Sequence, residues 1–99
     1  FRRLAAEEGV VFPDHFVYVT GVGSRSGVEA AIADLPPGVT EMYVHPAADT
    51  PELRAFCPDW EARVDDLDLV TGDDLRSRLE ASGATLISYR PLRELQRSA

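Results

Sequence analysis

The sequence predicts an α/β protein with about three parallel strands and flanking helices in a single small domain. Short β-branched and aromatic runs alternate along the chain with segments whose apolar residues repeat every three or four positions. Alternation of this kind is typical of parallel strands joined by right-handed crossover helices. The chain length of 99 residues supports one domain with a modest core.

The first predicted elements are a helix over residues 1–8, which Gly9 ends, and a strand over residues 16–20. The strand is aromatic and β-branched, as half-buried strands commonly are. The helix has no capping residue before it, and the chain begins with Phe1 instead of methionine. We therefore expect residues 1–99 to be a single fragment of a longer protein, with a trimmed but complete small domain as the alternative.

A helix and the second strand follow in the predicted order. Ser26 begins a Ser-x-x-Glu capping box, and apolar residues repeat at helical spacing over residues 28–35, so we predict a helix that Pro36 ends. Residues 39–45 then alternate between apolar and polar side chains, which predicts a strand with one apolar and one polar face.

Three further helices are predicted in the second half of the chain, each beginning at a residue that can cap its first turn. The expected starts are Thr50, Asp59 and Thr71, and Gly83 is the expected end of the last of these helices. A third strand over residues 85–89 and a short final helix complete the prediction. Three strands leave the edges of a parallel sheet uncovered, which is a second indication that neighbouring chain is missing.

Composition argues against several functional classes. A net charge of −7, from ten basic and seventeen acidic residues, is unlike that of proteins that bind the nucleic-acid backbone. Cys57 is the single cysteine, so no internal disulfide can form. The sequence has neither an apolar run of the roughly 18 residues that a membrane span needs nor a basic and apolar leader. We therefore expect a cytoplasmic protein with no nucleic-acid or membrane partner.

The second predicted strand holds the candidate catalytic residue. Its alternation puts Met42 and Val44 on one face, and the other face carries Glu41, Tyr43 and His45. His45 lies at the carboxyl end of the strand, where β/α barrels and open α/β sheets place their active sites. Because histidine transfers protons near neutral pH and also binds metals, a catalytic role for His45 stands beside a plain hydrogen-bonding role in a loop.

Other polar residues give weaker signals. His15 and Asp14 precede the first strand, where a barrel is usually built for stability. We therefore expect a loop histidine and a turn-forming aspartate, with a functional role for Asp14 as the lesser alternative. No pair of Cys or His residues has the spacing of a metal site. The acidic residues within 65–74 fit a solvated helix face, and Arg63 with Asp66 fits a surface ion pair.

A series of short motifs runs from about residue 13 to residue 92. The most specific part is a proline–glycine turn, a Thr-Glu pair and a strand that ends in His-Pro. The segments in the series are Pro13–Phe16, Leu35–Glu41, Tyr43–Pro46, Arg63–Leu67, Val70–Thr71 and Gly83–Arg90. Together they resemble the carboxy-terminal part of the YdjC-like carbohydrate deacetylase family. The chain departs from the family pattern at Ala47, where glycine is usual, and at Asp66, where glutamate is usual.

The resemblance implies a distorted β/α (TIM-like) barrel, of which this chain would be the carboxy-terminal portion. In such enzymes a divalent metal, Mg or Zn, activates water to attack the acetamide of an N-acetylated sugar or oligosaccharide. The family's metal ligands come from parts outside this sequence, so we expect no metal to be bound by this chain alone. The resemblance makes His45 the candidate catalytic proton donor to the leaving amine, and Tyr43, Glu41 and Asp14 the candidate substrate-binding residues.

Two functional hypotheses follow from these observations. In the first, the chain is a fragment of a carbohydrate deacetylase that is inactive alone and associates with itself or with the amino-terminal part of the same protein. Self-association is expected because exposed strand edges pair readily with other strands. In the second, the chain is a complete small α/β module for binding or regulation without catalysis.

Overall fold

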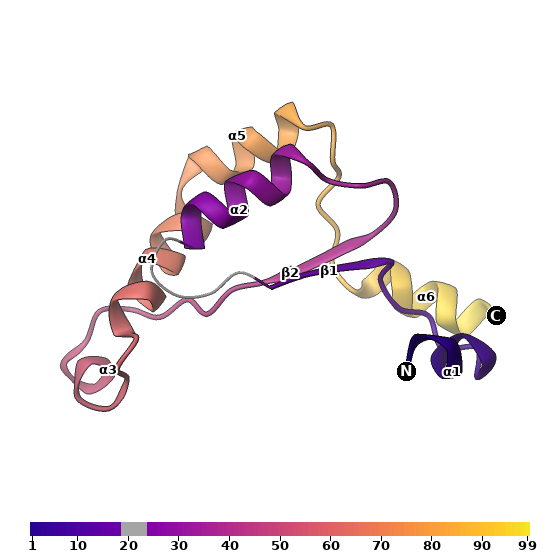
Figure 1. Cartoon of the computed structure of the whole chain (residues 1–99), viewed down its shortest axis with the longest axis horizontal. Helices are drawn as coiled ribbons and strands as arrows, with labels where there is room; N and C mark the ends of the chain where they lie inside the picture. Colours follow the sequence, from indigo (N-terminus) through magenta and orange to yellow (C-terminus); the bar gives the residue numbers. More distant parts are fainter. Residues whose placement is uncertain (19–23) are drawn as a thin grey trace.

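The computed structural model describes residues 1–18 and 24–99, and within them it contains six helices and two strands. In chain order the elements are α1 (Arg2–Glu7), β1 (His15–Tyr18), α2 (Ser24–Ala33), β2 (Thr40–Tyr43), α3 (Pro51–Phe56), α4 (Trp60–Thr71), α5 (Asp73–Ala81) and α6 (Arg90–Ser98). Helices α2 and α5 lie side by side on one side of the strand pair, α3 lies at one end of the molecule, and α1 and α6 lie at the other (Figure 1). No helix in these described parts is long and apolar enough to cross a membrane.

Strands β1 and β2 pair in parallel, which confirms the predicted strand direction. The register puts His15 opposite Thr40 and Tyr18 opposite Tyr43, so both strands begin at one end of the pair and finish at the other. The first strand was predicted to continue to residue 20, but residues 19–20 lie outside the described residues. The predicted α/β architecture with parallel strands is therefore confirmed for the two strands that form.

The prediction of a third strand over residues 85–89 is wrong. These residues run as irregular chain between α5 and α6, and in the described structure β2 pairs with β1 alone. The Leu86 side chain is 80% exposed and Ile87 is 43% exposed, so the segment lacks the apolar burial on both faces that stabilises a parallel strand. The sheet is consequently not closed into a barrel, and self-association through a strand edge stays a prediction.

The core lies between the helices and the strand pair. Val28 and Ile32 of α2 pack with Leu69 of α4, and all three side chains are at most 5% exposed. Met42 and Val44 pack against this cluster. Their position confirms the predicted apolar face of the second strand, and it leaves the opposite face for Tyr43 and its neighbours.

One expected helix start and two expected helix ends are confirmed. The Thr50 hydroxyl accepts the Leu53 N–H at 3.1 Å and caps α3, with Pro51 in the first turn. Gly9 and Gly83 follow α1 and α5 with φ values of +71° and +77°, the left-handed conformation that ends helices and suits glycine.

Two of the expected helix starts are corrected, and a third is confirmed in position but not in its side-chain hydrogen bond. Helix α2 begins at Ser24, so Ser26 lies inside it instead of at its cap. Thr71 is the last residue of α4, and its hydroxyl donates to the Leu67 carbonyl at 2.7 Å. Asp59 does occupy the cap position of α4, but its carboxylate accepts the Cys57 thiol and Arg63 Nε–H instead of a helix N–H.

Candidate functional site

Aromatic rings gather on the exposed face of the strand pair, with Tyr43 at their centre. The Tyr43 ring centroid lies 5.4 Å from that of Phe16 and 5.0 Å from that of Tyr18, both on β1. The His45 ring meets the Tyr43 ring edge-on, with 5.0 Å between centroids and an interplanar angle of 79°. Phe16 and Tyr18 are 56% and 60% exposed. The structure therefore brings Tyr43 and His45 together on one open face, as predicted. The predicted strand over residues 39–45 is shorter than expected, because β2 ends at Tyr43 and His45 follows it.

His45 is held in place through its backbone. Its N–H donates to Asp66 Oδ2 at 2.9 Å, across 21 residues of sequence. Two residues later, the Ala47 N–H donates to the Arg63 carbonyl at 3.1 Å, so both hydrogen bonds run to α4. The His45 side chain is half-buried, which leaves part of its ring open to a reactant.

Asp66 is a residue of this site that the sequence interpretation missed. It is 3% exposed, whereas Asp65, Asp68, Asp73 and Asp74 are exposed as predicted for a solvated face. The predicted surface pair with Arg63 is wrong, because Arg63 Nε bonds Asp59 Oδ1 at 3.2 Å instead. The available signal was periodicity: Asp66 lies four residues after Ala62 and three before Leu69, and both of those residues are buried.

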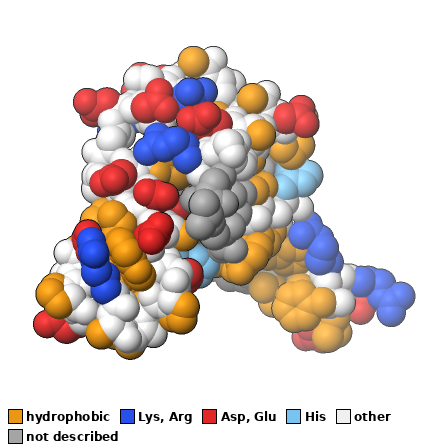
Figure 2. All heavy atoms as spheres, turned by 60° about the vertical axis from the view of Figure 1, so that its left-hand side comes forward, with side chains coloured by type: hydrophobic (Ala, Val, Ile, Leu, Met, Phe, Trp, Pro, Cys, Tyr) orange, Lys and Arg blue, Asp and Glu red, His pale blue; other side chains and the backbone are white. Residues whose placement is uncertain are grey.

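Ion pairs hold several acidic residues of the helices. Acidic and basic side chains lie close to one another over the face that Figure 2 shows. Arg78 pairs with Asp74 on its own helix at 2.9 Å and with Glu29 of α2 at 3.5 Å. Arg25 of α2 reaches Asp74 at 4.0 Å. These exposed pairs link α2 to α5, and they contribute little to stability individually.

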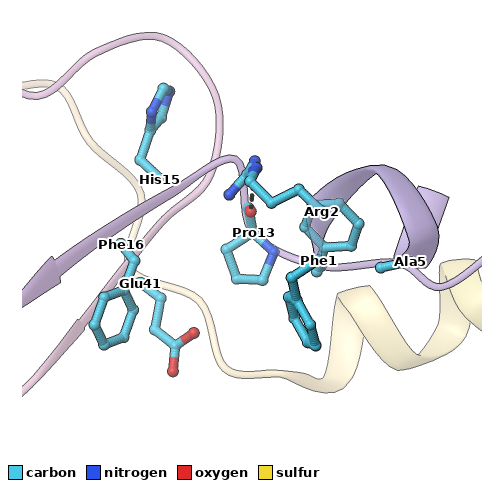
Figure 3. Close-up of a pocket in the computed structure, with 8 residues that line it drawn as sticks. Phe1, Arg2, Ala5, Pro13, His15, Phe16 and Glu41 are labelled. Carbon is cyan, nitrogen blue, oxygen red and sulfur yellow. Dashed lines mark hydrogen bonds between the residues drawn. The ribbon is translucent and has the colours of Figure 1, made fainter.

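Glu41 lies further from His45, towards the start of β2. Its carboxylate accepts the Tyr89 hydroxyl, and this hydrogen bond is the main reason why the pKa of Tyr89 is raised above its ordinary value. Glu41 also borders a pocket of about 170 Å³ that Phe1 and Phe16 help to line. Figure 3 shows Glu41 beside Phe16, with Phe1 just before the amino-terminal helix, on the other side of Pro13. Tyr89 was not predicted as a partner of Glu41, since 48 residues separate the two.

Asp14 and His15 stabilise a turn. Asp14 Oδ2 accepts the Val39 N–H at 2.8 Å, and a Cβ atom on Gly38 would lie only 2.6 Å from the same oxygen. His15 Nε2 lies 3.0 Å from the Pro37 carbonyl oxygen. The seven residues from Val39 to His45 span roughly 20 Å of extended chain. The structure therefore does not bring Asp14 next to His45, and a role for Asp14 in substrate binding stays a prediction.

The described residues do not fit a metal site by themselves. They contain no group of three or more His, Cys, Asp or Glu side chains that could hold a metal ion. Near His45 the donor set consists of one imidazole and the Asp66 carboxylate, which already accepts a backbone N–H. Cys57 is buried elsewhere, and its thiol donates to Asp59 Oδ1 at 2.8 Å. A resident metal would need ligands from outside the part of the chain that the structure describes.

Comparison with known proteins adds one finding. The family described as YdjC-like protein matches residues 1–81 of the chain. The matched range includes both strands, the His45 segment and the whole of α4, and it ends at the last residue of α5. No curated protein and no solved structure gives a significant match.

Proposed function

The chain belongs to the YdjC-like protein family, and on that premise we propose that it supplies the proton-donating part of a carbohydrate deacetylase active site. The family is associated with carbohydrate deacetylases and is metal-dependent in general. The proposed substrate is an N-acetylated sugar or oligosaccharide, and the proposed reaction is hydrolysis of its acetamide. His45 is the proposed catalytic residue.

The position of His45 is the observation that carries the proposal. It follows the carboxyl end of a parallel strand, which is the end at which α/β proteins build their active sites. Its backbone is fixed by the hydrogen bond to Asp66, while its half-buried ring faces the aromatic surface around Tyr43. A fixed backbone with a partly open ring is the arrangement that general acid catalysis needs.

Hydrolysis of an acetamide assigns His45 a defined step. A water oxygen bonds to the carbonyl carbon while the water gives up a proton to a base, and the bond between that carbon and the sugar nitrogen then breaks. The nitrogen departs as an amine only if it gains a proton, and the protonated His45 ring donates it. The products are acetate and a sugar with a free amino group. A bound divalent metal would supply the activation of this water, as in the family generally.

Tyr43 and Glu41 are proposed to bind substrate from the same strand face. The Tyr43 ring touches the His45 ring, and it combines an apolar surface with a hydroxyl that can hydrogen-bond a sugar. Glu41 lies two residues earlier on the strand, and its carboxylate is shared with the Tyr89 hydroxyl. We therefore place Tyr43 beside the reacting group and Glu41 further along the substrate.

Replacing each histidine in turn tests the proposal. In the natural protein with this sequence, we expect His45→Ala to abolish acetate release from N-acetylated chitooligosaccharides, because the leaving amine loses its proton source. His15→Ala is the matched control, since that ring contacts the Pro37 carbonyl at the other end of the strands. The control should retain activity. Unchanged acetate release by the His45 variant would remove His45 from the mechanism and favour a non-catalytic binding module.

A further inference from the structure

We propose that Asp66 is a positioning residue: its buried carboxylate sets where the His45 ring lies against Tyr43. The inference rests on the proposed function of His45, and it adds a residue that acts through His45 without touching substrate. Three observations carry it, which are the burial of Asp66, a second hydrogen bond beside the first, and the packing of α4.

The burial of Asp66 shows that its side chain has a specific interior role. A carboxylate that is 3% exposed has lost nearly all of its contact with water, which is costly unless hydrogen bonds compensate. Asp66 Oδ2 accepts the His45 N–H at 2.9 Å, and hydrogen bonds to an ionised acceptor are stronger than neutral ones. The interaction therefore fixes the backbone at the candidate catalytic residue itself.

A second hydrogen bond fixes the same segment one step further along. The Ala47 N–H donates to the Arg63 carbonyl at 3.1 Å, and Arg63 lies one helical turn before Asp66. Between the two donors stands Pro46, which has no N–H to satisfy. Residues 45–47 are thus fastened to α4 at both ends, so the backbone of His45 has little freedom to rotate.

Helix α4 links the position of the His45 backbone to the packing of the core. Ala62 and Leu69 are buried on the same face of α4 as Asp66, and Leu69 packs with Val28 and Ile32. A shift of the Asp66 carboxylate would consequently move the His45 backbone relative to Tyr43 on β2. Because proton transfer depends on the placement of the donor, a displacement of about 1 Å can lower the rate of a reaction by as much as about 100-fold.

The test measures the position of His45 directly, by NMR of the 99-residue chain. In Asp66→Asn a neutral oxygen replaces the carboxylate, so we expect the His45 amide proton to move upfield and to exchange about tenfold faster. The ring protons of His45 should also shift, because their placement over the Tyr43 ring changes. Asp65→Asn is the matched control, since it removes the same charge from the neighbouring exposed residue and should leave His45 unchanged.

Asp66→Ala removes the acceptor completely and should enlarge each of these changes. If it does not fold, the Asn variant decides alone. Unchanged His45 amide and ring signals in Asp66→Asn would overturn the proposal. Changes spread evenly through α2 and α5, instead of concentrated at residues 44–47, would also overturn it, since they would mark a purely structural role.

Acetate release separates this inference from the proposed function. In the full-length protein we expect Asp66→Asn to lower kcat about tenfold with little change in KM, because binding is kept while the proton donor is misplaced. If His45→Ala abolishes activity while Asp66→Asn moves the ring and keeps full kcat, the positioning role fails alone. If His45→Ala stays active, the proposed function fails, whatever the NMR result.

Discussion

At the amino-terminal end of the β1–β2 pair, Asp14 accepts the Val39 N–H at 2.8 Å and the His15 ring lies 3.0 Å from the Pro37 carbonyl. At the carboxyl end, Asp66 accepts the N–H of His45 itself at 2.9 Å, and the His45 ring lies against Tyr43. Both ends thus hold an aspartate and a histidine. At the amino-terminal end the His15 ring lies within hydrogen-bonding distance of a backbone carbonyl. At the carboxyl end it is the backbone N–H of His45 that is hydrogen-bonded, and the His45 ring faces the open side of the strands.

This difference shows how the same two residue types serve a turn in one place and a candidate active site in the other. Asp14 is exposed and close to Gly38, whose φ of +108° suits glycine and whose missing Cβ leaves room for the carboxylate. Asp66 is buried among core residues of α4. Replacing Asp66 should therefore cost more stability than replacing Asp14.

The largest expected effect is on stability. Asp66→Ala should lower the free energy of unfolding by about 1–3 kcal/mol, because a partly buried N–H at His45 loses its acceptor. Asp14→Ala should cost less than about 1 kcal/mol, since water can replace the acceptor at the exposed turn. Urea denaturation of both variants measures the two values. Equal losses would erase the distinction between the two ends of the strand pair.

Local sequence patterns were enough to predict much of the scaffold. The Thr50 cap and the helix ends at Gly9 and Gly83 each depend on residues close together in the chain. The parallel direction of the two strands follows from the alternation of strand and helix patterns along the chain. The placement of Tyr43 with His45 was also predictable, because side chains alternate along a strand whatever surrounds it. At the candidate site, therefore, the strand face was predictable from sequence.

Features that depend on distant partners were not predictable in the same way. Residues 85–89 have the composition of a strand, but a parallel strand forms only where both of its faces are covered. Asp66 has the composition of a surface residue, and its burial depends on a backbone N–H that lies 21 residues away. Tyr89 meets Glu41 across a still longer separation. In each case the missing information was tertiary contact instead of local propensity.

A smaller effect concerns Glu41, which lies between the two ends. The hydrogen bond from Tyr89 raises the pKa of Tyr89 above 10.0. A raised pKa means that the interaction stabilises the fold at pH values below 10.0 and that this stabilisation is lost as the pH rises through the raised value. Glu41→Ala should return the pKa of Tyr89 towards 10.0 in a tyrosinate absorbance titration. Tyr89→Phe shows which part of the absorbance change comes from Tyr89. An unchanged titration curve in Glu41→Ala would show that the two side chains do not interact.

The smallest expected effect is on the pKa of Asp59 at the start of α4. This part of the helix lies next to Arg63, whose carbonyl accepts the Ala47 N–H. The Cys57 thiol and then Arg63 lower the pKa of Asp59 below its ordinary 3.8. Because the lowered pKa belongs to the folded state, the charged carboxylate adds stability above pH 3.8, and this contribution is lost as the pH falls through the lowered value. Cys57→Ala should raise the pKa of Asp59 in an NMR titration, whereas Cys57→Ser keeps a donor and should preserve it. If both variants leave the pKa of Asp59 unchanged, the thiol contributes nothing to this cap. The start of α4 would then depend on Arg63 alone, and the rigidity that we assign to the carboxyl end of the strands would have to come from Asp66 and the core.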